Sequence, residues 1–217
     1  MKKRRKSILK KLVLIVIMLV IVGMIVQIKF KPQEAILANG WNLILVNKNH
    51  FIPEDYEVDL MVLPNGKSVD SKIYEPLQEM VSVAESEGLY MVVVEAYRTE
   101  AEQQEMLDEK IEMYIQRGYP KFLAEIYAQK WVAKPGTSEH QLGIAVDINP
   151  DYTKSDRSQV YAWLEENGYK YGFIYRYPED KVQITGINNE PWHYRYVGVE
   201  AAKEMYEKDL CLEECLK

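Results

Sequence analysis

Residues 135–147 read PGTSEHQLGIAVD, and we expect the rest of the chain to be organised around this stretch. It places a hydroxyl (Ser138), an imidazole (His140) and two carboxylates, one of them Asp147, within thirteen residues. The Pro-Gly pair at its start breaks the helical pattern that precedes it, and the apolar run from Gly143 onward is typical of a short strand. The sequence thus predicts a loop that carries His140 and a strand that carries Asp147.

A second imidazole, His193, follows 46 residues after Asp147, in the motif EPWH at residues 190–193. Two imidazoles and one carboxylate are a common set of ligands for catalytic zinc, and they leave one coordination position open for water. That water needs a base outside the ligand set, and Glu190 is a candidate. From spacing alone, Asp147 could instead be the base and Glu190 the ligand, or all of these could be ordinary hydrogen-bonded polar residues.

Three further polar residues are candidates for substrate binding. Arg98 directly follows an apolar strand-like segment, where its guanidinium could form a fork with a substrate carboxylate. Gln103 lies one helical turn into the next element and could face the same pocket, while Ser138 could bond substrate or cap a turn. The remaining histidine, His50, has no acidic or imidazole partner close in sequence, and we interpret it as non-catalytic.

The N-terminus has the charge pattern of a membrane anchor. Seven basic residues precede an uncharged run at residues 12–28, and two more follow it. The run is at the short end of a bilayer span, and the basic excess before it keeps the N-terminus in the cytoplasm. We predict a basic stub and single transmembrane signal anchor over residues 1–31, a linker over 32–41, and an outward-facing domain over 42–217. A cleaved signal peptide would leave that domain in the same place.

The domain itself is acidic. After residue 31 the chain carries 18 Lys and Arg against 33 Asp and Glu, a net charge of −15, which disfavours nucleic-acid binding. Its length fits one domain, and we expect a monomer. Cys211 and Cys215 lie four residues apart near the C-terminus, and we interpret them as surface thiols, free or disulfide-linked.

Hydrophobic periodicity predicts an α+β domain with a mostly antiparallel sheet. Helices are expected around residues 77–84, 100–117, 120–131, 157–167 and 199–214. Strands are expected at residues 41–47, 90–95, 143–149, 171–175, 181–185 and 192–197. In the helix after Pro120, we expect the buried side to consist of Phe122, Leu123, Ile126, Tyr127 and Trp131.

Four stretches resemble the VanY-type D-alanyl-D-alanine carboxypeptidases, a zinc peptidase group that also includes L,D-carboxypeptidases and VanX-type dipeptidases. They are LILVNKNHFIP, AYRTEAEQQEML, KPGTSEHQLGIAVDI and EPWHYRY, and they cover nearly all of residues 42–197 in the order of that family. The combination of Ser-x-His-x6-Asp with Glu-x-x-His is highly specific. Thr99 departs from the family, which often has Ser there.

The resemblance implies the hedgehog/D,D-peptidase fold, with zinc (Zn2+) bound by His140, Asp147 and His193 and with Glu190 as catalytic base. It implies that Arg98, Gln103 and Ser138 hold the terminal carboxylate or polarise the scissile carbonyl. The expected reaction removes the last D-Ala from peptidoglycan stem pentapeptides outside the bacterial cell membrane. The alternatives are an L,D-carboxypeptidase acting on tetrapeptide stems and a non-catalytic cell-wall-binding module.

Overall fold

The computed structural model describes residues 33–34 and 40–216 of the chain. The predicted anchor over residues 1–31 lies outside these residues, as does most of the predicted linker. Among the described residues, no helix combines the length and the apolar character needed to cross a membrane.

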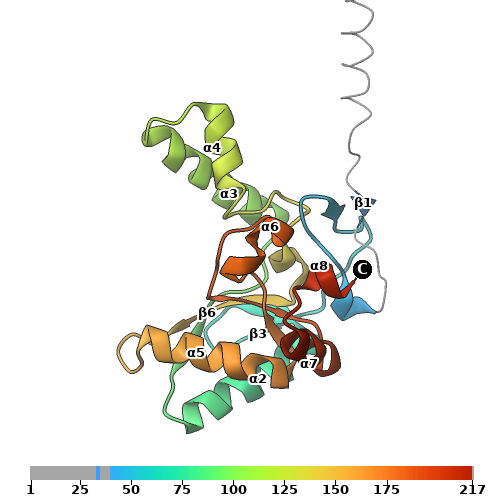
Figure 1. Ribbon diagram of the computed structural model, residues 1–217, viewed down its shortest axis with the longest axis vertical. Coiled ribbons are helices and arrows are strands. Elements are labelled where there is room, and N and C mark those ends of the chain that lie inside the picture. Colours follow the sequence, from blue (N-terminus) through green and yellow to red (C-terminus); the bar gives the residue numbers. More distant parts are fainter. Residues whose placement is uncertain (1–32, 35–39, 217) are drawn as a thin grey trace, which may run out of the picture. The chain divides into compact units, whose positions relative to one another are not determined.

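A four-stranded antiparallel sheet forms the centre of the domain, with the strand order β5-β6-β8-β7 (Figure 1). Its strands are β5 (Met91–Glu95), β6 (Ala145–Pro150), β7 (Phe173–Tyr175) and β8 (His193–Tyr196). The register places Glu95 opposite Asp147, and Asp147 opposite His193. Since directly opposite residues point to the same face of a sheet, three polar side chains from separate strands form one row.

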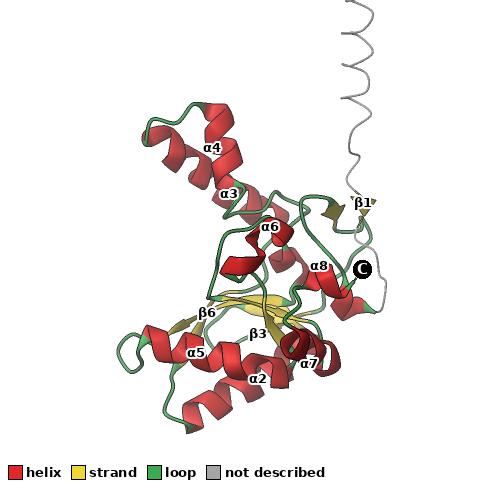
Figure 2. Ribbon diagram, in the orientation of Figure 1, coloured by secondary structure: helices red, strands yellow, loops and turns green. Residues whose placement is uncertain are grey.

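Helices lie on both faces of this sheet, so the predicted α+β class is confirmed (Figure 2). On one face lie α2 (Ser71–Ser86) and α5 (Arg157–Asn167), and on the other lie α6 (Val182–Thr185) and α8 (Leu212–Cys215). The helix α7 (Val199–Lys208) packs together with α8 against Ile174 of β7. A further helix, α3 (Glu100–Gln116), packs against α4 (Lys121–Ala128). The main core joins Leu77 and Met80 of α2 to Val93, Val146 and Ile148 of the sheet.

The shorter elements connect this framework. Two-residue strands are β1 (Gln33–Glu34) and β2 (His50–Phe51), and a hairpin pairs β3 (Leu60–Val62) with β4 (Ser68–Asp70). The 3-10 helices are η1 (Trp41–Leu43), η2 (Glu139–Leu142), η3 (Gly168–Tyr171) and η4 (Glu179–Lys181). Only two residues separate η2 from the first residue of β6, so the loop that carries His140 leads directly into the sheet.

Local sequence signals identify several elements closely. The helix α5 has the predicted bounds, and α3 begins at the predicted residue, where Thr99 and Glu102 form a capping box. The predicted strands at 90–95, 143–149, 171–175 and 192–197 correspond to β5, β6, β7 and β8. These predictions are confirmed. Helix caps and alternating apolar residues act over a few positions, so they can be recognised in the sequence alone.

Two predicted strands are wrong. Residues 41–47 begin with η1, and the carbonyl groups of Asn42 and Ile44 accept hydrogen bonds from the Arg195 guanidinium rather than from a neighbouring strand. Residues 181–185 form the end of η4 and α6. This segment connects β7 to β8, which pair directly with each other, and β8 is also paired with β6. No edge of β8 is therefore left for another strand.

The prediction for the buried side of α4 is also wrong in part. Ala124 and Ala128 are the buried residues of this helix, whereas Phe122 is 63% exposed and Ile126 is 53% exposed. Close packing against α3 uses the small side chains, which turns the larger ones outward. The predicted terminal helix is interrupted at Asp209, which has a positive φ of 52°, so α7 and α8 are separate.

Candidate active site

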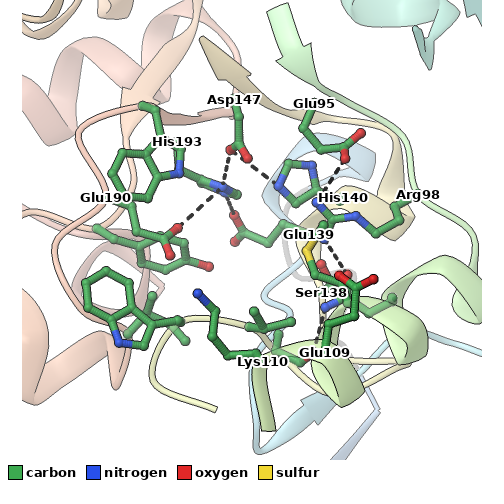
Figure 3. A pocket seen from close by; sticks show the side chains of 18 of the residues that line it. Glu95, Arg98, Glu109, Lys110, Ser138, Glu139, His140, Asp147, Glu190 and His193 are labelled. Carbon is green, nitrogen blue, oxygen red and sulfur yellow. Dashed lines mark hydrogen bonds and ion pairs between the residues drawn. The ribbon is translucent and has the colours of Figure 1, made fainter. Parts of the chain in front are cut away.

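Three potential metal ligands converge from different elements. Asp147 comes from β6, His193 from β8 and His140 from η2 (Figure 3). Asp147 Oδ1 lies 3.0 Å from His193 Nδ1 and 3.4 Å from His140 Nε2. One donor atom from each residue falls within 4.8 Å of the other two, a group that could hold a metal ion. Sheet register and the short η2–β6 connection thus bring together residues that are distant in sequence.

Both imidazole rings are oriented by hydrogen bonds on their far sides. His140 Nδ1 lies 2.7 Å from the Ala96 carbonyl oxygen, to which it donates, so its Nε2 faces Asp147. His193 Nε2 lies 3.4 Å from Glu139 Oε2, so its Nδ1 faces Asp147. Metal-binding histidines characteristically donate their other ring N–H to a carbonyl or carboxylate, which fixes the tautomer and the ring orientation.

A buried charge cluster supports His193 from behind. Glu139 Oε1 lies 2.8 Å from Arg176 Nε and 3.1 Å from a terminal nitrogen of Arg195, and the three side chains are fully buried. Arg176 also pairs with Glu213. Burial acts to raise the pKa of Glu139, but the two guanidinium groups outweigh it and hold that pKa well below its usual range. Glu139 therefore stays ionised at neutral pH.

Sequence reasoning missed the roles of Glu139, Arg176 and Arg195. The available signal was Arg195 itself, which lies within an otherwise aromatic strand segment, HYRY. A buried arginine requires a carboxylate partner, and Glu139 directly precedes a proposed ligand.

The donor set fits a divalent cation. Burial acts to raise the pKa of Asp147, but the two neighbouring imidazoles outweigh it and hold the pKa well below its usual range. For His193 burial acts in the opposite direction, yet Asp147 and Glu139 raise its pKa to about 9. The carboxylates thus create a strongly cation-attracting position. Two nitrogen donors and one oxygen donor at that position match the preferences of zinc.

Glu190 lies beside this position without being part of the group. Its carboxylate is buried, and Oε2 is 3.9 Å from His193 Nδ1. Burial raises the pKa of Glu190 to about 8. A carboxyl group with a pKa near neutrality can both accept and return a proton.

The structure brings Arg98, Gln103 and Ser138 to the same cavity, which has a volume of about 490 Å³. All three are buried, and Arg98 donates to Gln103 Oε1 at 2.6 Å. Gln103 in turn donates to the Ala133 carbonyl oxygen at 2.6 Å, so its side chain is held at both ends. Arg98 Nε is buried and has no hydrogen-bond partner within the part of the chain that the structure describes.

The other residues considered from sequence lie elsewhere. His50 Nδ1 contacts Asn47, and His50 is absent from the lining of this cavity. Cys211 and Cys215 are free thiols in and beside α8, and Cys211 is buried rather than on the surface as expected.

The chain is similar to known D-alanyl-D-alanine carboxypeptidases. A model of the VanY family, described as D-alanyl-D-alanine carboxypeptidase, matches residues 66–199. The D-alanyl-D-alanine carboxypeptidase of Enterococcus faecalis is 50% identical over 193 residues, which cover 85% of this chain and 72% of that protein.

Two solved structures are similar over most of their length. One is a mutant of the vancomycin resistance D,D-pentapeptidase VanY, from a VanB-type resistance cassette, in complex with Zn(II). It is 52% identical with a TM-score of 0.80, covering 82% of this chain and 99% of that one. The other is VanYB in complex with D-alanine-D-alanine, which is 53% identical with a TM-score of 0.80, covering 81% and 97% of the two chains.

Proposed function

The chain belongs to the VanY family of D-alanyl-D-alanine carboxypeptidases, and we propose from this membership and from its site that it is a zinc-dependent D,D-carboxypeptidase. It removes the terminal D-Ala from peptidoglycan stem pentapeptides. The observation that carries the proposal is the convergence of His140, Asp147 and His193 on one position with Glu190 beside it.

Three side chains would hold the zinc ion, through His140 Nε2, an Asp147 carboxylate oxygen and His193 Nδ1. When bound there, zinc polarises the scissile carbonyl and lowers the pKa of water to about 7. The Ala96 carbonyl and the Glu139 carboxylate keep the two imidazoles in the required tautomers.

Glu190 acts as the general base and then as the general acid. It accepts a proton from the attacking water and returns it to the amine of the departing D-Ala. Its burial supports this role, because burial raises the pKa of Glu190 and so strengthens the carboxylate as a proton acceptor.

Arg98 holds the terminal carboxylate of the substrate. Its Nε hydrogen is unpartnered within the described residues and its Nη1 donates to Gln103, so Gln103 fixes the guanidinium plane while donors remain for the ligand. Ser138, buried at the wall of the cavity, supplies a hydroxyl to the same end of the substrate.

The location of the enzyme is part of the proposal. The basic stub and the uncharged run of residues 1–31 anchor the chain in the bacterial cell membrane with the catalytic domain outside. Peptidoglycan stems are accessible on that side, and we expect a monomer.

The test is mass spectrometry of stem peptides incubated with the zinc-loaded protein. A pentapeptide ending in D-Ala-D-Ala is expected to lose one alanine, and a tetrapeptide stem is expected to remain intact. Selective cleavage of the tetrapeptide would show an L,D-carboxypeptidase instead.

A further inference from the structure

The cavity extends well beyond the residues assigned above. At about 490 Å³ it falls within the range that holds drug-sized ligands, so it has room for more of a peptide than two alanine residues. One face of α3 forms a wall of this space through Gln103, Met106, Lys110 and Met113, which recur at helical spacing. Lys110 is the cation on that wall.

Lys110 has the surroundings of an anion-binding group. Its side chain is half-buried and extends into the cavity on the side of Glu190 (Figure 3). Its ammonium lies 5.9 Å from the centre of the Trp131 ring. Within residues 40–216 it forms no ion pair. The Arg98 guanidinium, by contrast, already forms an ion pair with the Glu95 carboxylate, with 3.6 Å between Nη2 and Oε2.

The position of Lys110 along α3 indicates which part of a peptide it meets. Lys110 follows Gln103 by seven residues, and at 1.5 Å per residue this is an axial offset of roughly 10 Å. An extended peptide advances about 3.3–3.6 Å per residue. If the terminal carboxylate lies at Arg98 and Gln103 and the extended peptide runs along α3, the third residue from the C-terminus lies level with Lys110.

We propose that Lys110 forms an anion subsite that selects D-Ala-D-Ala peptides whose third residue from the C-terminus carries a side-chain carboxylate. This inference rests on the proposed function and adds the class of substrate to it. The Lys110 ammonium forms an ion pair with the side-chain carboxylate of the peptide, to which it donates a hydrogen bond. Trp131 lies beside the ammonium and reduces the exposure of that ion pair to water.

Glu109 is the residue that could oppose this selection. It also lines the cavity, but it lies on the side of Ser138, away from the direction in which Lys110 extends (Figure 3). If Glu109 instead set the preference at the third residue, peptides with a cationic side chain there would be the better substrates.

The experiment compares three peptides of the form acetyl-X-D-Ala-D-Ala, in which X is 2-aminopimelate, norleucine or lysine. These side chains are of similar length and are anionic, neutral and cationic. For the full-length zinc-loaded protein, kcat/KM is expected to be roughly tenfold higher for the anionic peptide than for the cationic one.

The ratio of kcat/KM for the anionic peptide to kcat/KM for the cationic peptide is expected to approach one in Lys110→Met. It is expected to persist in Lys110→Arg and to invert in Lys110→Glu. As a matched control, Lys121→Met removes a lysine from the exposed surface of α4 and should retain the wild-type ratio.

A wild-type ratio near one, a preference for lysine at X, or an unchanged ratio in Lys110→Met would overturn the subsite. Cleavage of none of the three peptides would contradict the proposed function instead. Calorimetry of the same peptides then tests the subsite independently of catalysis. Tighter binding of the anionic peptide, lost in Lys110→Met, would support the subsite. Equal binding of the three peptides would overturn it.

Discussion

Oε2 of Glu139 lies 3.4 Å from Nε2 of His193, and this contact links a buried charge cluster to the proposed metal ligands. Glu139 is anchored on its other oxygen by Arg176 and Arg195. The carboxylate therefore orients the His193 ring without contacting a substrate, which makes it a positioning residue.

Glu139→Gln is expected to weaken zinc binding by about 10- to 100-fold. The reason is that the negative charge of Glu139, which the substitution removes, both orients the His193 ring and makes that ring more basic. Competition with a chromophoric chelator measures the affinity, and circular dichroism checks that the variant is folded. Glu109→Gln, which alters another glutamate of the same cavity, is the control. Equal zinc affinity in the Glu139 variant and the wild type would show that the contact has no positioning role.

Arg98→Lys is expected to lower kcat/KM by about 10- to 100-fold, mainly through a higher KM. A lysine keeps the charge but cannot donate to Gln103 and to a substrate carboxylate in one planar fork. Steady-state kinetics on a D-Ala-D-Ala peptide gives the result. Arg117→Lys, at the exposed end of α3, should leave both constants unchanged, and the same behaviour in Arg98→Lys would remove Arg98 from the substrate site.

The pair formed by Glu213 and Arg176 predicts a pH dependence of stability. Burial acts to raise the pKa of Glu213, but Arg176, at 2.7 and 2.9 Å, outweighs it and lowers that pKa. A carboxyl group whose pKa is lower in the folded state stabilises the protein above its unfolded pKa, which is about 4.3 for glutamate. This stabilisation is lost as the pH falls through the folded pKa.

Urea unfolding between pH 7 and pH 3 measures this effect. The free energy of unfolding should fall more steeply below about pH 5 in the wild type than in Glu213→Gln, at the same zinc loading. Glu207→Gln changes an exposed glutamate of α7 and should follow the wild-type curve. Parallel curves for the wild type and Glu213→Gln would mean that the pair does not couple protonation to folding.

Gly143 is expected to be intolerant of a side chain. Its φ is +71°, and an added Cβ would lie 2.7 Å from Val58 Cγ1 and 3.0 Å from the Asp70 backbone nitrogen. Gly143→Ala should therefore lower the free energy of unfolding by about 2–4 kcal/mol, combining the conformational penalty with steric overlap.

Gly66→Ala separates these two contributions. Gly66 has a φ of +86°, but an added Cβ would meet no atom within 4 Å. Its variant should lose only the conformational part, about 1–2 kcal/mol, in the same denaturation experiment. Equal losses at the two positions would contradict the steric explanation at Gly143.

The proposed ligands could be selected from sequence because their chemical types are informative and the chain has only three histidines. Spacing could not decide between Asp147 and Glu190 as the ligand. In the structure, the β6–β8 register places Asp147 opposite His193, whereas Glu190 precedes β8 and its nearest approach to His193 Nδ1 is 3.9 Å. Strand register depends on pairing across the sheet, which local patterns do not encode.

The errors have the same origin. Residues 181–185 are rich in β-branched side chains, but they form the end of η4 and α6 in the connection between β7 and β8, which pair directly with each other. Phe122 and Ile126 are apolar yet exposed, because α3 packs against the alanines of α4. In each case a tertiary contact outweighs the local preference of the sequence.

The central claim is that this chain uses one zinc ion and Glu190 to activate water, and release of D-Ala from a D-Ala-D-Ala pentapeptide tests it most directly. Exhaustive chelation should abolish release, added zinc should restore it, and penicillin should have no effect because no serine acyl-enzyme forms. Glu190→Gln should retain one zinc ion per chain while kcat falls by about 10²- to 10⁴-fold. Undiminished release by the metal-free protein or by Glu190→Gln would contradict the claim. Equal stem-peptide binding by the wild type and this variant, with no release by either, would identify a binding module instead.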